Sequence, residues 1–503
     1  MLMEHFDVLV VGAGLSGIGA GCHLQTNCPD KRYVILEGRE AIGGTWDLFR
    51  YPGIRSDSDM YTLGYSFRPW TEAKAIADGP NILNYVRQTA QDAGIDRKIR
   101  FKHRVVRALW STEAAKWTVE VERGPSKETV RFSCDFLFMC SGYYNYEAGY
   151  TPDFAGAERF KGRIVHPQKW PENLDYAGKR VVVIGSGATA VTLVPAMAPT
   201  AAHVTMLQRS PTYILTLPAI DGIANFLRRI LPAKVAYGIT RWKNVFLAMM
   251  VFVLSRRSPE FVKKLIRAGV KSHLPPGYDV DTHFKPRYKP WEQRLCLVPD
   301  ADLFKAIKQG SASVVTDHIE TFTEKGIKLE SGAELEADII ITATGLSLLP
   351  LGGMTMAVDG KSIDLAKSMS YKGMMLSDVP NLAITVGYTN ASWTLKADLT
   401  CEYVCRLLNH MDRHGYRQCT PRINDPTVTE EPFIDFSSGY VQRALDKFPK
   451  QGSKTPWKLY QNYALDIIAL KFGRVEDGAM VFSGPGPADM AMANAAGPTS
   501  PPA

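Results

Sequence analysis

The order of apolar and polar positions predicts two units built in the same way. In the first unit, the apolar run 6–11 leads into a glycine-rich turn, a helix-compatible stretch at 18–25 and a second apolar run at 33–36. In the second unit, the apolar run 180–184 opens into another glycine turn. Short apolar runs that end in turn signals are typical of strands buried on both faces of a parallel sheet. The pattern therefore predicts an α/β fold.

Each unit continues with a β excursion and a strand that ends in small residues. Apolar residues alternate at 117–121 and 130–132 and lead to the run 136–140 and Ser141-Gly142. Later, 327–335 has the pattern of a hairpin that turns at Ser331-Gly332, and the run 338–341 leads into Ala343-Thr344-Gly345. We interpret this as a coarse internal repeat of two nucleotide-binding units.

The residues between the two halves of the second unit have a different composition. Residues 220–274 are poor in proline and rich in Leu, Phe, Met, Lys and Arg, which predicts a helical insertion. Residues 245–254 are continuously apolar, but ten residues cannot cross a bilayer that needs about 20. We expect a buried or substrate-gating helix there, with peripheral membrane contact as the lesser alternative.

These patterns predict two Rossmann-like dinucleotide-binding domains, the second of which carries the helical insertion. Residues 43–57, with three Gly and one Pro among aromatic residues, are expected to form a loop, and 391–411 a long helix. The expected division is 1–145 and 380–483 for the first domain, 146–216 and 292–379 for the second, 217–291 for the insertion, and 484–503 for a disordered tail.

Composition excludes several classes of protein. The chain of 503 residues is 45% hydrophobic, and its net charge of +8 includes no long basic run interleaved with aromatic residues, so nucleic acid is not an expected partner. Eight cysteines without a C-x-x-C pair fit neither a disulfide scaffold nor a zinc site, and we expect no metal; Cys401 and Cys405 are expected to serve packing. The first apolar run ends at once in Gly12, unlike the longer apolar region of a signal peptide, so we expect a cytoplasmic protein. For the oligomeric state, the sequence gives no direct signal, and a monomer is favoured.

The first glycine turn, Gly12, Gly14 and Gly17, follows the G-x-G-x-x-G pattern of dinucleotide-binding proteins. Glycines at these positions let the backbone approach a pyrophosphate, whose charge is stabilised at the helix N-terminus. Glu37 stands 20 residues after Gly17, at the end of the second strand, where a carboxylate binds an unmodified ribose. The first unit is therefore predicted to bind FAD or NAD.

The second turn, Gly185, Gly187 and Ala190, differs at the end of its second strand, where the chain has Gln208, Arg209 and Ser210. A carboxylate would repel a 2′-phosphate, whereas a guanidinium and a hydroxyl bind one. We predict NADPH at this unit. The alternative for Arg209 is a solvated surface arginine.

Two longer patterns reveal a resemblance. Phe160, Gly162, His166, Trp170 and Pro171 form F-x-G-x-x-x-H-x-x-x-W-P. A second pattern consists of Gly43, Gly44, Trp46, Tyr51, Pro52, Gly53 and Asp57. With both patterns, the chain resembles the flavin-dependent Baeyer–Villiger monooxygenases (class B flavoprotein monooxygenases), in particular the ethionamide-activating mycobacterial type, up to about residue 475.

The resemblance implies FAD on the first unit, with Gly44, Thr45, Trp46 and Asp57 beside it, and NADPH on the second. It implies a flavin C4a-peroxide that inserts one oxygen atom from O₂ into a ketone to give an ester or lactone, with sulfoxidation as a side reaction. In the family an arginine of a Lys-Arg pair stabilises the anionic peroxide. The matching residue here is Arg294, oriented by Asp57, and Gln293 stands in place of the lysine.

The resemblance also assigns residues outside the glycine turns. Phe160, Gly162, His166 and Trp170 would couple domain movement to catalysis, although a packed interdomain histidine is an equal alternative for His166. Trp457 is similar to a late tryptophan that contacts the nicotinamide ribose in the family.

Other functions remain to be weighed. A flavin-containing monooxygenase that oxidises N or S atoms would share the fold, but its linker pattern ends in Phe or Tyr where this chain has Trp170. A disulfide reductase needs a cysteine pair after the first Gly-Gly, and 46–57 contains no cysteine. A non-enzymatic flavoprotein would need no cation near the flavin.

Overall fold

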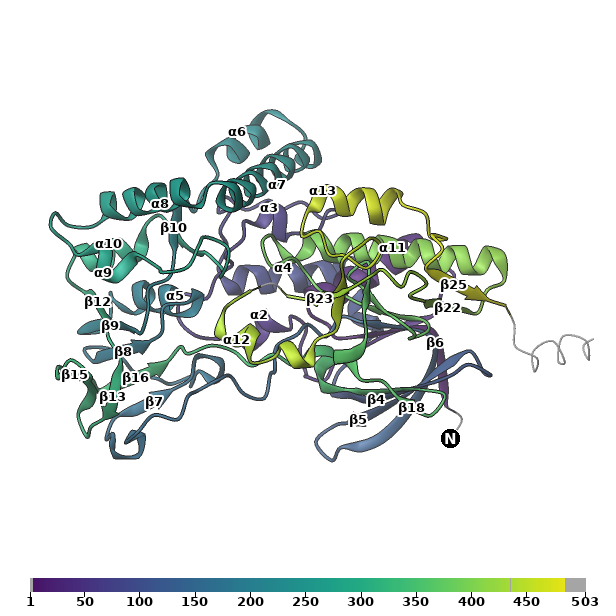
Figure 1. Ribbon diagram of the computed structural model, residues 1–503, viewed down its shortest axis with the longest axis horizontal. Helices are drawn as coiled ribbons and strands as arrows, with labels where there is room; N and C mark the ends of the chain where they lie inside the picture. Colours follow the sequence, from purple (N-terminus) through teal and green to yellow (C-terminus); the bar gives the residue numbers. More distant parts are fainter. Residues whose placement is uncertain (1–2, 435, 485–503) are drawn as a thin grey trace, which may run out of the picture.

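A computed structural model describes residues 3–434 and 436–484 and contains two α/β units side by side (Figure 1). The predicted disordered tail lies outside the described residues except for Gly484. The sheet of the first unit has the strand order β18-β17-β4-β5-β6-β1-β2-β3, with β21 paired to β6. Its strands are β1 (Glu4–Val11), β2 (Tyr33–Leu36), β3 (Ile99–Arg100), β4 (His103–Ser111), β5 (Lys116–Arg123), β6 (Glu128–Met139), β17 (Thr355–Val358), β18 (Lys361–Ser362) and β21 (Leu382–Ile384).

The sheet of the second unit has five parallel strands in the order β12-β9-β8-β16-β7. These are β7 (Arg163–Val165), β8 (Arg180–Ile184), β9 (His203–Gln208), β12 (Ala312–Thr316) and β16 (Ile339–Thr342). The predicted hairpin is confirmed, because β14 (Gly326–Leu329) and β15 (Glu334–Glu336) pair around Gly332, beside β13 (Ile319–Phe322). Two strand–turn–helix units with β excursions confirm the predicted α/β class and the internal repeat.

One predicted boundary differs from the structure. Residues 355–362 were assigned to the second domain, but β17 pairs in parallel with β4 and extends the first sheet. Met369, Tyr371 and Met374 likewise belong to the hydrophobic core of the first unit. These strands are too short for a periodicity to show which sheet they join, since pairing is a tertiary property. We therefore place the return of the chain to the first unit near residue 350 rather than 380.

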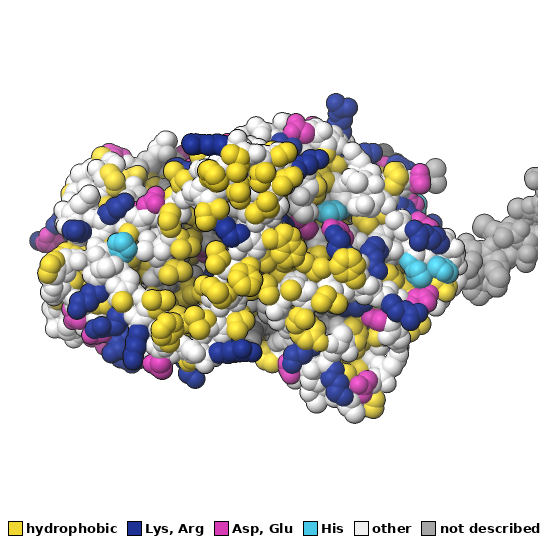
Figure 2. Space-filling view, turned by 90° about the horizontal axis from the view of Figure 1, so that it is seen from above, with side chains coloured by type: hydrophobic (Ala, Val, Ile, Leu, Met, Phe, Trp, Pro, Cys, Tyr) yellow, Lys and Arg dark blue, Asp and Glu magenta, His cyan; other side chains and the backbone are white. Residues whose placement is uncertain are grey.

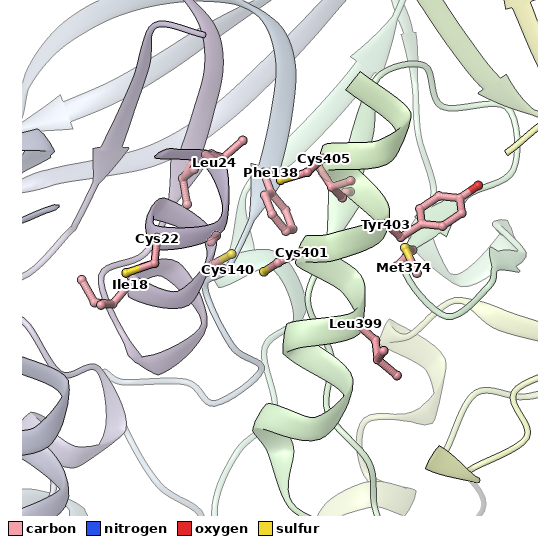
Figure 3. Close-up of a cluster of buried hydrophobic side chains, with 14 of the residues drawn as sticks. Ile18, Cys22, Leu24, Phe138, Cys140, Met374, Leu399, Cys401, Tyr403 and Cys405 are labelled. Carbon is pink, nitrogen blue, oxygen red and sulfur yellow. The ribbon is translucent and has the colours of Figure 1, made fainter. Parts of the chain in front are cut away.

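The first core is centred on the contact between α1 (Leu15–Asn27) and α11 (Trp393–His414), with α4 (Gly79–Asp92) on the other side of α1. Figure 3 shows Cys22 of α1 and Cys401 and Cys405 of α11 in one cluster of buried apolar side chains. Burial raises the pKa of the Cys22 thiol to about 12, so it stays protonated at neutral pH. The packing role predicted for Cys401 and Cys405 is thus confirmed, as is the long helix.

The insertion is helical, as predicted, and consists of α6 (Gly222–Ile230), α7 (Ala233–Arg257), α8 (Pro259–His273) and α9 (Val280–Phe284). The expectation that 245–254 would be buried is wrong. Only a narrow side of α7 faces the protein, where Arg241 donates to the carbonyl oxygens of Tyr61 and Gly64, both at 2.8 Å. Phe246 on the opposite side is 66% exposed. A helix that is apolar on most sides has more apolar surface than one neighbouring domain covers.

Smaller elements complete the described part. α5 (Ala188–Met197) and α10 (Asp302–Lys308) flank the second sheet, and the predicted loop 43–57 contains one helical turn, α2 (Thr45–Leu48). In the part of the chain that is described, no helix combines the length and apolar character needed to cross a membrane. Further short elements are α3 (Met60–Leu63), β10 (Ile214–Leu217), β11 (Cys296–Pro299), β19 (Ser370–Tyr371), β20 (Met375–Leu376), β22 (Gln418–Pro421), β23 (Glu430–Pro432), α12 (Gly439–Gln442), β24 (Lys450–Gly452), α13 (Tyr463–Asp466) and β25 (Met480–Ser483).

Candidate active site

A cleft of about 480 Å³ runs from the first glycine turn toward the second unit. Eight of the predicted site residues line it: Gly12, Gly14, Glu37, Gly44, Thr45, Trp46, Asp57 and Arg294. The cleft also reaches Ala188 and Thr189 at the start of α5, which belongs to the second unit. Residues that are far apart in sequence therefore form one site that extends from the first glycine turn to the second unit.

The first turn needs its glycines for space. Gly12 has φ +101°, and a Cβ there would lie 2.7 Å from the carbonyl oxygen of Cys140. Gly17 lies behind the cleft, where a Cβ would lie 1.8 Å from the carbonyl oxygen of Gly12. No side chain caps the N-terminus of α1 at Gly14, so its first N–H groups point toward the cleft. The turn thus has the free donors and the open backbone that a pyrophosphate requires.

Glu37 lies at the edge of the cleft with its carboxylate already held in place. One oxygen accepts from the backbone N–H of Ala13 at 2.7 Å, and the other from that of Arg39 at 2.8 Å. A carboxylate has about four acceptor positions, so two remain for ribose hydroxyls. The interaction with Ala13 also ties the second strand to the glycine turn.

The loop that follows is fixed by a buried acid. Asp47, only 4% exposed, forms ion pairs with Arg39, Arg50 and Arg87 at 2.8–2.9 Å. Oγ1 of Thr45, two residues earlier, is 3.1 Å from the hydroxyl of Tyr146. These contacts hold the segment Gly44-Thr45-Trp46 against the cleft.

Arg294 lies two residues before β11, which pairs with β10. Its Nε is 3.2 Å from Oδ2 of Asp57, and its side chain is 38% exposed, toward the cleft. Burial by itself would lower the pKa of Arg294, but the carboxylate of Asp57 raises it above the ordinary value of an arginine. The structure therefore places a permanent positive charge at the cleft, beside the carboxylate predicted to orient it.

Arg294 also lines a second, enclosed cavity of about 30 Å³, which sequence reasoning missed. Most of its wall is aromatic or aliphatic: Tyr143, Leu348, Val386, Tyr388, Phe433, Phe436, Tyr440 and Leu459. One end is polar, because Nζ of Lys396 is 3.0 Å from Asp466. These residues come from five separate segments, so no local pattern indicates them.

The second glycine turn is more open. Gly185 has φ +130° and a Cβ there would lie 2.3 Å from the carbonyl oxygen of Ala343, whereas a Cβ at Gly187 would meet nothing within 4 Å. Ala190 is fully buried against the sheet. The hydroxyl of Ser186, inside the turn, donates to the carbonyl oxygen of Ser210 at 3.1 Å, which brings the end of β9 to the turn.

Arg209 is exposed beside this turn, and no described carboxylate forms an ion pair with it. Its guanidinium is therefore available to bind an anion. Gln208 is different, since it is buried and its amide donates to His283 and Thr316 at 2.8 Å. The arrangement leaves Arg209 and Ser210 available for a 2′-phosphate, and it assigns Gln208 to packing.

The loop from Tyr51 to Asp57 joins the two units. Gly53 has φ +74°, and a Cβ there would lie 2.5 Å from Cβ of Ala196 on α5. Arg55 forms an ion pair with Asp302 at the start of α10. The glycine in this pattern is therefore required by a close approach between units, a reason that the sequence did not reveal.

The linker residues lie outside the cleft. Phe160 is buried against Phe322 in the second unit, and a Cβ at Gly162 would lie 2.3 Å from the carbonyl oxygen of Asp338. The ring of His166 is 3.3 Å from the carbonyl oxygen of Gly345, and burial lowers its pKa. Trp170 packs on the core of the second unit. All of these contacts lie within the second unit, so the coupling of domain movement to catalysis by the linker residues stays a prediction.

Trp457 and Gln293, which the resemblance singled out, both lie away from the cleft. Trp457 is 2% exposed and packs edge-on against Tyr371 in the core of the first unit. It lines none of the described cavities near the turns, so the predicted contact with a nicotinamide ribose does not fit this structure. Gln293 precedes Arg294 and is half-buried, and it does not line the cleft.

The comparisons place the chain in a family. Residues 7–369 match the model of the flavin-binding monooxygenase-like family. The chain is 57% identical over 483 residues to the FAD-containing monooxygenase EthA of Mycobacterium tuberculosis, which covers 96% of this chain and 98% of that protein. It is 49% identical to the probable FAD-binding monooxygenase AlmA of Acinetobacter baylyi, with 95% and 96% covered.

Solved structures share the fold. A steroid monooxygenase bound to NADP matches with a TM-score of 0.76 and 21% identity, covering 95% of this chain and 99% of the other. An open form of cyclohexanone monooxygenase matches with a TM-score of 0.74 and 20% identity, covering 96% and 100%. The architecture of two Rossmann-like units is thus confirmed.

The fold and the cleft define a two-nucleotide α/β flavoprotein. The chain belongs to the flavin-binding monooxygenase-like family, and the resemblance to Baeyer–Villiger monooxygenases found in the sequence is confirmed.

Proposed function

We propose that this protein is an FAD- and NADPH-dependent Baeyer–Villiger monooxygenase that converts ketones to esters or lactones with one oxygen atom from O₂. The observation that supports this best is the position of Arg294. It lies between the cleft that suits a dinucleotide and an enclosed cavity of largely apolar walls, and Asp57 holds it there.

The residues present fit both nucleotides. The open donors of the first turn, the anchored Glu37 and the segment Gly44-Thr45-Trp46 would hold FAD along the 480 Å³ cleft. Gly185, Gly187, Arg209 and Ser210 would hold NADPH at the second turn, and α5 brings that turn to the same cleft. FAD, once reduced by NADPH, supplies the reactivity toward O₂.

Arg294 contributes a fixed positive charge. Oxygen insertion beside a carbonyl develops negative charge on oxygen, and a preoriented cation in a poorly hydrated site stabilises that charge. The arginine stays protonated at every pH at which the enzyme is stable. Asp57 keeps the guanidinium in one position, so little reorganisation is needed when charge develops.

The same site has a second candidate function, oxygenation of a soft sulfur or nitrogen atom. A sulfur or nitrogen atom is oxidised without attack on a carbonyl group. Its oxidation therefore does not require the oxidant to be an anion, as the oxidation of a ketone does. The cation at Arg294 favours the first function, and the second would be a side activity of the same cleft.

The deciding experiment is product analysis after aerobic incubation with NADPH and linear, cyclic and aryl ketones, with a thioether as a parallel substrate. We expect esters or lactones that carry one atom of ¹⁸O from ¹⁸O₂. Formation of sulfoxide without any ester from the whole panel would reject the first function in favour of the second.

A further inference from the structure

Three helices of the insertion turn an apolar face outward. On α7 the exposed apolar residues recur every three or four positions, as on one side of a helix: Val235, Ile239, Trp242, Phe246, Met250 and Val253. α6 does the same with Ile223, Phe226 and Ile230, and α8 with Phe261 and Leu265. An amphipathic helix of a globular protein normally turns this stripe toward the core. Here α7 and α8 bury some apolar residues, such as Val245 and Val262, but their outward side is apolar as well.

These residues form a concentrated surface. Of the 23 large apolar side chains exposed in the described residues, thirteen lie between 220 and 265. α6, α7 and α8 pack side by side, and Trp242 contacts Tyr463 of α13. Leu465 of α13 is also exposed, as are Ile468 and Phe472 in the helical segment Ile467–Phe472 that follows. Figure 2 shows this face from above, with yellow side chains gathered over it. We call it the docking face; ordinary monomers rarely expose apolar patches beyond a few hundred Å².

The docking face is surrounded by positive charge. Residues 220–274 contain eleven Lys and Arg but two Asp and Glu, a net +9, so the remaining chain is close to neutral. Five of these basic residues are exposed and have no ion pair with any described carboxylate: Arg229, Lys234, Arg256, Arg257 and Lys264. The net positive charge of the whole protein therefore comes from this one segment.

We propose that the docking face binds the surface of an anionic phospholipid bilayer. Amphipathic helices with Lys and Arg beside an apolar stripe lie in the plane of a membrane, with the stripe among the acyl chains and the charges at the headgroups. A second copy of this chain is a poorer occupant, because two identical faces would bring their basic rims together. Anionic lipid neutralises that rim.

The docking face lies close to the enclosed cavity. Val245, on the inner side of α7, packs against Tyr388, which lines that cavity. Between a bilayer in contact with the outer side of α7 and the cavity would lie only this helix and the side chains packed on its inner side. The proposal concerns binding alone, however, and it stands whether or not the protein oxidises ketones.

The test is co-sedimentation of the FAD-containing protein with vesicles of phosphatidylcholine alone or mixed equally with phosphatidylglycerol. We expect binding to the anionic vesicles that weakens at high salt. Ile230→Asp/Phe246→Asp should reduce it at least about tenfold, because each change removes an exposed apolar side chain that would insert among the acyl chains. The matched control Ile423→Asp/Val481→Asp, at exposed apolar positions outside the docking face, should bind like the parent.

A second pair of variants tests the charges. Arg256→Gln/Arg257→Gln should weaken binding to anionic vesicles roughly fivefold for each charge, whereas Lys127→Gln/Lys361→Gln, at exposed lysines elsewhere, should not. Retained FAD absorbance and an unchanged melting temperature show that each variant is folded. Parent protein that stays in the supernatant with anionic vesicles overturns the proposal. So does a stable dimer in sedimentation velocity that Ile230→Asp/Phe246→Asp converts to monomer, since a second copy would then cover the face.

Discussion

The two glycine turns have the same local structure but different surroundings. The first is enclosed: Gly12 and Gly14 face a cleft whose other wall is the loop around Gly44, and Glu37 is hydrogen-bonded to the turn itself. The second is open, with empty space at Gly187 and an exposed arginine beside it. A ligand covered on several sides dissociates slowly, whereas one bound at an open turn exchanges readily. This difference suits a resident flavin and a nicotinamide nucleotide that comes and goes.

Arg294 is the residue that both units share. It is carried by the segment before β11 in the second unit, yet its partner Asp57 and the cleft belong to the first. The most informative variants separate the role of each glycine turn from the role of Arg294 and Asp57, which form the junction between the two units.

Replacing Arg294 should have the largest effect. Arg294→Met keeps most of the bulk and removes the charge, so we expect ester formation to fall about 100- to 1000-fold. Consumption of NADPH should continue, because it depends on the two turns, and O₂ should then appear as hydrogen peroxide. Ester and peroxide are measured in the same reaction. Arg287→Met, an exposed neighbour, is the matched control; ester formation at the parent rate in Arg294→Met would remove this residue from the mechanism.

Arg209→Ala should alter only the second turn. Loss of one charge-assisted contact with a 2′-phosphate corresponds to a roughly 10- to 100-fold loss in kcat/KM for NADPH. The kcat/KM for NADH should stay the same, which serves as the internal control, and FAD content should not change. An equal loss for both nucleotides would mean that Arg209 supports the fold instead of reading the phosphate.

Asp57→Asn should weaken the junction more mildly, about tenfold in ester yield per NADPH consumed. The amide is similar in size but no longer pairs with Arg294, so the guanidinium moves while its charge remains. The measurement is the ratio of ester to hydrogen peroxide. A ratio like that of the parent would show that Arg294 is held well enough by its other neighbours.

The linker variants His166→Ala and Trp170→Ala should have the smallest effect, a several-fold fall in turnover with FAD fully bound. Both residues stand in the segment that leads from the first unit into the second, where His166 is close to Gly345 and Trp170 packs on the second core, so both changes should loosen this segment. Stopped-flow reduction of the flavin and steady-state turnover, compared side by side, locate the affected step. Parent rates in both measurements would contradict a role in domain coupling.

Much of the fold could be predicted because its signals are local. The runs that became β1, β8 and β16 are short and apolar and end in glycine or small residues, and this pattern is produced by burial of a parallel strand. Glycines at 12, 17 and 185 were recognised because contact with neighbouring backbone leaves no room for a side chain. The run 245–254 misled the prediction, since apolar composition does not show whether a helix faces a core or a membrane.

By itself, the sequence determined that two nucleotide turns exist, that Glu37 and Arg209 distinguish them, and that Arg294 and Asp57 are a candidate pair. Spacing along a strand–turn–helix carries the information on the turns, Glu37 and Arg209, whereas Arg294 and Asp57 were indicated by the resemblance to the family. Only the tertiary structure decided that Trp457 is a core residue, that β17 and β18 extend the first sheet, and that Tyr143, Tyr388 and Tyr440 surround one cavity with Arg294. Contacts between distant segments depend on how whole units pack, and packing leaves no periodic trace in any single stretch of chain.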